Sequence, residues 1–202
     1  MKIAKLLVLS LLVSFAAPAF GAIVIDFGTG VAGSGGTFNL LTGGNASGTN
    51  IPIGSMTVVG SVGHDGVYAV SGTCSGSGGA NVGCLNFNTA TNTVTITGAV
   101  TSLGVGSQTL LTGSFLNWTA SDVGLTSAYG PDSKATALLT ALGASPNTQF
   151  AYFGFSLSAS GSGTAAISTD IRNSGVPEPA SMSLIGLGLA GLALAGRRFR
   201  RA

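Results

Sequence analysis

The sequence predicts a mainly β protein: an antiparallel β-sandwich or jelly-roll-like domain with one short helix, between an N-terminal signal peptide and a C-terminal transmembrane helix. Three observations lead to this prediction. Short β-branched and aromatic runs are separated by turns rich in Gly, Ser and Asn, as in antiparallel all-β domains. A single Ala/Leu run ends at a glycine, which is typical of a short helix. Uncharged apolar runs lie near both ends of the chain.

About eight or nine short strands are expected, connected by polar turns. The runs that predict them are 23–27, 37–41, 55–62, 67–71, 84–98 (a hairpin), 108–120, 149–158 and 164–171. The turn 63–66 has a glycine at each end and predicts a tight hairpin between two of these runs. The helix is expected over 135–142, with the polar residues 131–134 as its cap and Gly143 as its stop.

Two of these runs also predict which side chains share a face. In the hairpin at 84–98, a loop at 89–92 sets Phe87 opposite Val94 and Leu85 opposite Ile96, on one face of the sheet. In the run 149–158, alternation predicts a buried face and an outward face. The residues expected on the buried face are Ala151, Phe153, Phe155 and Leu157, with Tyr152 on the other face beside Gly154.

The N-terminus has the pattern of a signal peptide. Lys2 and Lys5 form a positive region, and residues 6–17 form the apolar stretch that follows it. Small residues at positions 19 and 21 predict cleavage after Gly21, with Ala22 as a close alternative. The mature protein is therefore expected to leave the cytoplasm.

The C-terminus contains three blocks in order. Pro177, Glu178 and Pro179 cannot continue a helix and predict a stiff, extended spacer. The uncharged run 180–196 would span roughly 25 Å as a helix, enough to cross a membrane if flanking side chains snorkel. Four arginines follow and are expected to hold this end on the cytoplasmic side: Arg197, Arg198, Arg200 and Arg201.

This ordered set resembles the PEP-CTERM sorting signal of exopolysaccharide-producing Gram-negative bacteria. The resemblance implies that Pro177, Glu178 and Pro179 are recognised by exosortase, a membrane-embedded transpeptidase that cuts near the motif. It further implies that the arginines form a retention cluster and that anchoring in the inner membrane is transient. The resemblance covers about an eighth of the chain and concerns sorting alone. The alternative is an ordinary single-pass anchor that follows a Pro-rich linker.

Between the two terminal segments, the sequence predicts one domain of low charge. The expected organisation is a signal peptide over 1–21, a β-rich extracellular domain over 22–171, a linker over 172–179, the membrane helix over 180–196 and a cytoplasmic basic tail over 197–202.

The whole chain has a net charge of +2. The region 22–175 has a net charge of −3, because Lys134 and Arg172 stand against Asp26, Asp65, Asp122, Asp132 and Asp170. Such a domain has no basic stripe for nucleic acid. Low charge and many glycines also occur in disordered chains, but the strand-like runs argue against disorder.

Two motifs have a structural interpretation. Cys74 and Cys84 are the only cysteines, and in an exported protein they are expected to form a disulfide, with free thiols as the alternative. Residues 28–33 match GxGxxG after an expected strand. We reject dinucleotide binding because residues 34–36 break the helix that this site requires.

Little in the sequence points to catalysis, so no enzyme activity, cofactor or metal is expected. His64 is the only histidine, so sites built on several histidines are excluded, and a triad with Asp65 lacks the GxSxG elbow. Glycoside hydrolysis needs two carboxylates roughly 5–10 Å apart, but most aspartates fall at expected turns. Asp65 and Asp122 are the residues to mutate if the protein acts on glycans.

Three aromatic residues are candidates for sugar contact: Trp118, Tyr129 and Tyr152. Three functions therefore remain in order of preference. The first is a non-enzymatic protein of the cell surface or exopolysaccharide matrix, in a Gram-negative bacterium. The second is a carbohydrate-binding module with the same sorting route, whose partner would be extracellular polysaccharide. The third is a glycan-active enzyme.

Overall fold

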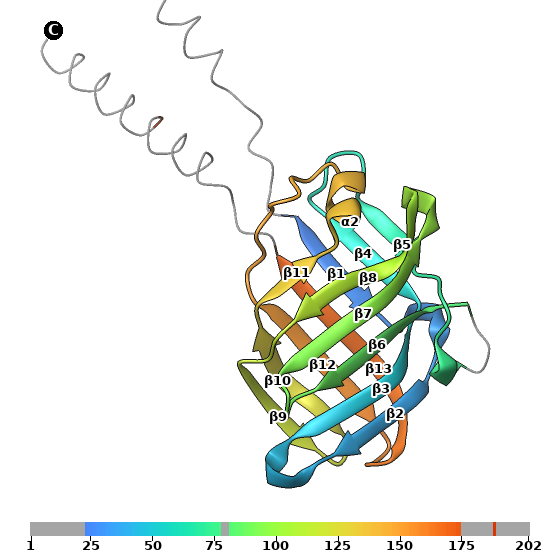
Figure 1. Ribbon diagram of the computed structural model, residues 1–202, viewed down its shortest axis with the longest axis vertical. Coiled ribbons are helices and arrows are strands. Elements are labelled where there is room, and N and C mark those ends of the chain that lie inside the picture. The colour runs from blue at the N-terminus through green and yellow to red at the C-terminus, as the bar shows by residue number, and fades with distance from the viewer. Residues whose placement is uncertain (1–22, 78–80, 175–187, 189–202) are drawn as a thin grey trace, which may run out of the picture. The chain divides into compact units, whose positions relative to one another are not determined.

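A single antiparallel sheet of thirteen strands makes up most of the part of the chain that the structure describes (Figure 1). This computed structural model describes residues 23–77, 81–174 and 188. The strands are β1 Val24–Gly28, β2 Gly35–Leu40, β3 Ala46–Ile53, β4 Ser55–Val59, β5 Gly66–Ala69, β6 Gly83–Asn88, β7 Thr93–Val100, β8 Val105–Gly113, β9 Asn117–Ser121, β10 Gly124–Gly130, β11 Asp132–Lys134, β12 Phe153–Ala159 and β13 Thr164–Ser174.

The sheet curls so that two layers face each other, and their strands cross in the view of Figure 1. One layer runs β11-β8-β7-β6-β3-β2, and the other contains β5-β4-β1-β13-β12-β10-β9. The long strand β13 joins them, because Thr164 and Ala166 pair with β2 whereas residues 170–174 pair with β1. The predicted mainly β, antiparallel fold is confirmed. Its strands form one continuous curled sheet instead of the two separate sheets of a sandwich, because β13 is long enough to pair in both layers.

Apolar side chains fill the space between the layers. Phe87, Phe115, Phe153 and Phe155 form an aromatic cluster there, with ring centroids 5.1–6.2 Å apart. All four are at least 97% buried, and each full burial of this kind stabilises the fold by about 1.5–3 kcal/mol. The cluster joins β6, the β8–β9 connection and β12, so it holds one layer against the other.

Both predicted hairpins are confirmed. β6 and β7 pair with Leu85 opposite Ile96 and Phe87 opposite Val94, and all four side chains are buried. β4 and β5 pair around the predicted turn, with Val58 opposite Gly66. Alternation fixed the face of each strand, and the short connections fixed the register.

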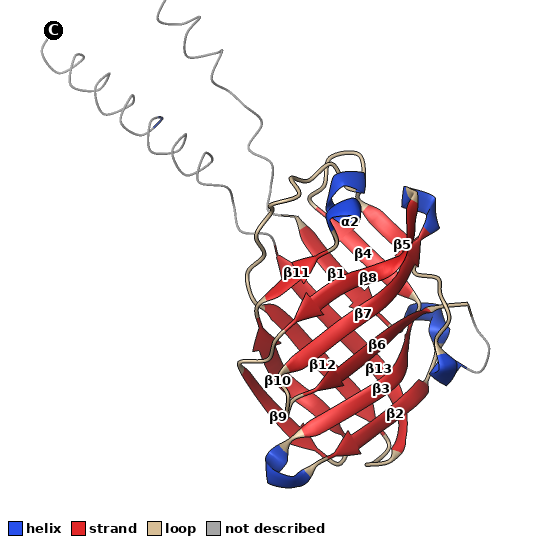
Figure 2. Cartoon of the chain, viewed as in Figure 1, coloured by secondary structure: helices blue, strands red, loops and turns tan. Residues whose placement is uncertain are grey.

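One short α-helix, α2 (Thr136–Ala141), lies within the predicted range and buries Leu138 and Leu139. Its predicted polar cap is wrong. Residues 132–134 instead form β11 and pair with β8, and the N-cap is Ala135, which makes no side-chain cap hydrogen bond. Figure 2 shows that the remaining described helical turns lie at connections between strands. These are the 3₁₀ turns η1 Gly30–Ala32, η2 Thr42–Gly44, η3 Ser75–Ser77 and η4 Thr101–Leu103.

Several strand predictions needed correction. β3 and β10 were not expected, and the run 108–120 is divided between β8 and β9. β3 tolerates Pro52 because its pairing with β2 ends at Thr49, so the missing N–H leaves no gap in that ladder. β12 begins at Phe153, which leaves Ala151 exposed. β13 continues to Ser174, beyond the predicted start of the linker at residue 172.

The disulfide between Cys74 and Cys84 is present, with Cα atoms 5.0 Å apart. It attaches the segment that contains η3 to the start of β6, and both cysteines are buried. The segment it closes is short, so the bond is expected to contribute about 2–3 kcal/mol.

The terminal targeting segments lie outside the described residues, apart from Gly188. This applies to the signal peptide at 1–21, to Pro177, Glu178 and Pro179, to the predicted membrane helix at 180–196 and to the arginine cluster. Among the residues that are described, there is no helix long and apolar enough to cross a membrane.

Candidate functional site

The outward face of β13 carries the charged residues of the candidate site. Along this strand, Ile171 and Asn173 point into the core, whereas Asp170 and Arg172 are exposed. Pairing sets Arg172 between Asp26 of β1 and Gly154 of β12, and sets Asp170 opposite Ser156. Because side chains on neighbouring strands share a face when they are in register, these groups form one continuous polar surface.

Two carboxyl groups meet on this surface, with a guanidinium opposite one of them. The pKa of Asp26 is raised to about 7, chiefly because burial penalises its charged form. The hydrogen-bonded carboxyl of Asp170 acts in the same direction, and Arg172 opposes both effects. We refer to Asp26, Asp170 and Arg172 as the outer charged cluster.

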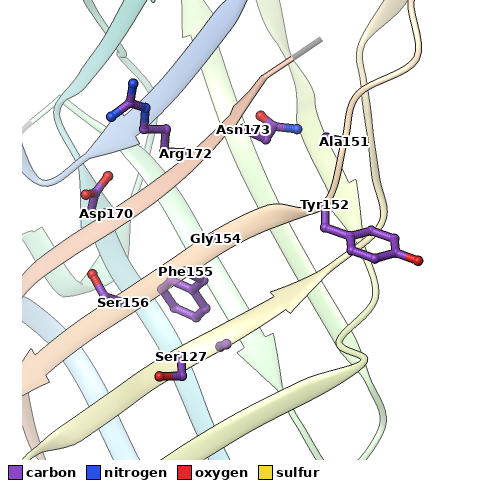
Figure 3. A pocket seen from close by; sticks show the side chains of 10 residues that line it. Ser127, Ala151, Tyr152, Gly154, Phe155, Ser156, Asp170, Arg172 and Asn173 are labelled. Atoms are coloured by element: carbon purple, nitrogen blue, oxygen red, sulfur yellow. The ribbon is translucent and has the colours of Figure 1, made fainter. Parts of the chain in front are cut away.

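Next to this cluster lies an open depression of ≈ 470 Å³, which we call the outer groove. Six of the residues that line it are Ser127, Tyr152, Gly154, Ser156, Asp170 and Arg172. Figure 3 shows Asp170 and Arg172 extending from the same strand, with Tyr152 at the other end of the groove. Gly154 lines the groove where it is open: an added Cβ would meet one atom within 4 Å, the Arg172 carbonyl oxygen at 3.8 Å.

Two tyrosines stack at the Tyr152 end of the groove. The rings of Tyr129 and Tyr152 lie 5.9 Å apart with 30° between their planes, and they are 39% and 59% exposed. A register shift in β10 precedes Tyr129 and leaves Ser127 at a φ of 52°, a backbone conformation that non-glycine residues rarely adopt. After this β-bulge, Tyr129 lies opposite Gly154. Two of the three predicted sugar-contact residues are thus brought together.

The third, Trp118, lies elsewhere. Its ring packs edge-on against Phe115, with centroids 6.3 Å apart, and its Nε1–H donates to the Gly44 carbonyl at 3.1 Å. These contacts attach β9 to η2, so Trp118 serves packing and covers the edge of β9. The location of Trp118 therefore gives no support for sugar contact at this residue.

The other residues considered for chemistry are separated. Asp65 accepts a hydrogen bond from the Ser61 N–H at 2.7 Å, which stabilises the β4–β5 turn, and the backbone carbonyl of adjacent His64 accepts one from Tyr68. Asp122 lies in the turn between β9 and β10. Within residues 23–77, 81–174 and 188, no group of three or more His, Cys, Asp or Glu could hold a metal ion.

A second polar cluster lies inside the sheet. Lys134 Nζ donates to Asp132 Oδ2 and to Asn173 Oδ1, the latter at 2.7 Å, while Asn173 Nδ2 donates to Asp132 Oδ1 at 2.6 Å. The ammonium group also lies 4.5 Å from the ring centroid of Phe150. Burial lowers the pKa of Lys134 to about 8 and raises that of Asp132, and their mutual attraction opposes both shifts. This interior polar cluster ties β11 to β13, and the side chains of Lys134 and Asp132 are buried.

Sequence reasoning missed the outer charged cluster. The alternation of Ile25 and Phe27 does place Asp26 outward on β1, so part of the signal was available. The pairing of β1 with β13 joins segments about 140 residues apart, and no short turn fixes that register. The carboxyl groups that do meet are therefore not Asp65 and Asp122, the pair singled out from the sequence.

The fold and the groove together define a class: a β-rich domain with an open surface groove, at one end of which two tyrosines stack. A family model described as the PEP-CTERM protein-sorting motif matches residues 175–201. The chain therefore carries an exosortase-type sorting signal, the mark of a protein exported through membrane-associated sorting. No curated protein and no solved structure matches the chain.

Proposed function

We propose that this chain is a non-enzymatic protein that reaches the cell surface or the exopolysaccharide matrix of a Gram-negative bacterium. The observation that carries the proposal is the sorting motif at residues 175–201. An exosortase-type transpeptidase recognises Pro177, Glu178 and Pro179 while the chain is held transiently in the inner membrane. Processing then releases the domain to its final location. The low charge and the many hydroxyl groups of the domain suit a hydrated polysaccharide environment.

Replacing Pro177, Glu178 and Pro179 with alanine tests the sorting step. The expected result is an unprocessed form that accumulates in the inner membrane, measured by fractionation and by the mass of the mature protein. A matched control replaces 145–147, an exposed Ser-Pro-Asn segment, with alanines. Normal surface display of the motif variant would refute the proposal, as would failure of the control to be sorted.

Carbohydrate binding is the second candidate function, and a specific observation favours it. Sugar rings present apolar C–H faces that pack on aromatic side chains, and Tyr129 and Tyr152 offer two such rings at one end of the outer groove. Full-length protein in detergent micelles is expected to be retained on the producing cell's polysaccharide. Tyr152→Ala should reduce retention, and Tyr152→Phe should preserve it. If Tyr152→Ala were retained as strongly as Tyr152→Phe, the tyrosines would have no role in binding.

A further inference from the structure

The charges of the outer groove restrict the kind of glycan that it can bind. Among the described residues, the only lysine and arginine side chains are Lys134, which is buried, and Arg172. Arg172 is itself flanked by Asp26 and Asp170. A polyanion approaching this surface would meet a domain of negative net charge and no uncompensated cation. Acidic polysaccharides are therefore poor candidates.

The groove is instead equipped for uncharged hydroxyl groups. A sugar hydroxyl both donates and accepts hydrogen bonds, so it is best matched by a donor group next to an acceptor group. Arg172 supplies N–H donors and Asp170 supplies carboxylate acceptors, with the Ser156 hydroxyl opposite Asp170. The rings of Tyr129 and Tyr152 lie at the other end, where a sugar ring can pack.

Size and openness favour a segment of a polymer over an enclosed small molecule. The volume of ≈ 470 Å³ lies within the range of about 300–1,000 Å³ found for ligand sites. Tyr152, Gly154, Ser156, Asp170 and Arg172 are all exposed, so a chain can enter and leave along the sheet surface.

We propose that the outer groove binds a short segment of neutral polysaccharide, with a sugar ring against the tyrosines and its hydroxyl groups on Asp170 and Arg172. This inference rests on the carbohydrate-binding candidate above and adds the substrate class and the residues that select it. Asp26 is a positioning residue, since it contacts Asp170 and lies beside the groove.

Gly154→Val gives the sharpest test because it places a side chain in the groove and changes no charged residue and neither tyrosine. The backbone of Gly154 does not need glycine, and the added Cβ has only one neighbour, at 3.8 Å. The matched control is Gly106→Val on β8, where an added Cβ would meet nothing within 4 Å. Both variants should keep the thermal midpoint of the wild type, since valine suits strands.

Full-length protein in detergent micelles is run by affinity electrophoresis through gels that contain mixed-linkage β-glucan, galactomannan or dextran, and through gels that contain alginate. We expect retardation by at least one neutral polymer and none by alginate. Gly154→Val, Asp170→Asn and Arg172→Gln should each weaken binding at least tenfold, and Gly106→Val should not.

Each of the other possible results shows which proposal is wrong. If the wild type binds no polymer in this panel, this inference is overturned, and the carbohydrate-binding candidate is overturned as well if the protein is also not retained on the producing cell's polysaccharide. If it binds and Tyr152→Ala abolishes binding while Gly154→Val and Asp170→Asn do not, the carbohydrate candidate survives and the assignment to the groove is wrong. Binding to alginate but to no neutral polymer overturns the substrate class. The sorting proposal is tested separately by localisation.

Discussion

The two faces of β13 each carry a cluster of polar and charged groups, one buried in the core and the other exposed to solvent. Facing inward, Asn173 joins Asp132 and Lys134 in a buried cluster in which the carboxylate and amide oxygens and the ammonium group are all bonded. Facing outward and within three residues, Asp170 and Arg172 meet Asp26 on a surface that solvent reaches. The interior cluster combines one carboxylate and one amide with a single cation, whereas the outer charged cluster combines two carboxyl groups with a single cation.

Burial decides what each cluster can do. A buried ion pair gains little net free energy when it forms, yet its loss leaves an uncompensated charge in the interior. The interior polar cluster therefore constrains how β11 lies against β13. Charges on the surface are screened and contribute little to stability, so the outer charged cluster can be specialised for binding. Three predictions test this division.

The largest effect is expected for Lys134→Met, which leaves Asp132 buried without its cation. We expect the free energy of unfolding to fall by about 3–5 kcal/mol, measured by urea denaturation. Replacing the whole cluster with Asp132→Leu, Lys134→Met and Asn173→Leu should cost less than the single change, because no charge remains buried. If Lys134→Met changed stability by less than about 0.5 kcal/mol, which is usual for exposed sites, the interior cluster would have no structural role.

An intermediate effect, dependent on pH, is expected for Asp26→Asn. The pKa of Asp26 is about 7 in the folded protein, against 3.8 for an unperturbed aspartate. Between these values the folded state binds more protons than the unfolded state, so stability decreases as the pH rises from about 4 to about 7. Asparagine mimics the protonated acid, so the variant should lose this part of the pH dependence.

The measurement is the thermal midpoint of wild type and Asp26→Asn from pH 4 to pH 8. The variant should match the wild type near pH 4 and exceed it at pH 8. Asp122→Asn, in an exposed turn, is the control and should follow the wild type throughout. Parallel curves for wild type and Asp26→Asn would mean that folding does not raise the pKa of Asp26.

The sequence predicts a feature well when that feature depends on residues that are close together along the chain. The β6–β7 hairpin was predicted to the residue because alternation and a short loop fix its register. β3 was missed because its Ser, Gly, Asn and Pro residues are typical of a loop, and it becomes a strand only between β2 and β6. Tertiary pairing there overrides local preference.

The candidate site likewise contains some features that local sequence predicts and others that depend on contacts between distant residues. Tyr152 was placed outward from alternation alone, and this is confirmed by its 59% exposure. Its stacking on Tyr129 depends on the β-bulge at Ser127, which has no clear signature in the sequence. Lys134 was assigned to a helix cap because it stands among polar residues, whereas its burial depends on Asn173, a residue 39 positions away. Contacts between distant strands account for these errors.

The smallest effect is expected for Arg172→Gln and Tyr152→Ala on the outer face. Each should change the free energy of unfolding by no more than about 0.5 kcal/mol, because both side chains are exposed and Arg172 lies where solvent and salt screen its charge. Urea denaturation of these variants beside Lys134→Met compares the change in the free energy of unfolding on the two faces of β13 directly. A loss of more than about 1 kcal/mol in either outer variant would show that the outer face helps to hold the sheet together. Reduced glycan binding by that variant could then reflect damage to the fold, and Gly154→Val would remain the decisive variant because it removes no contact.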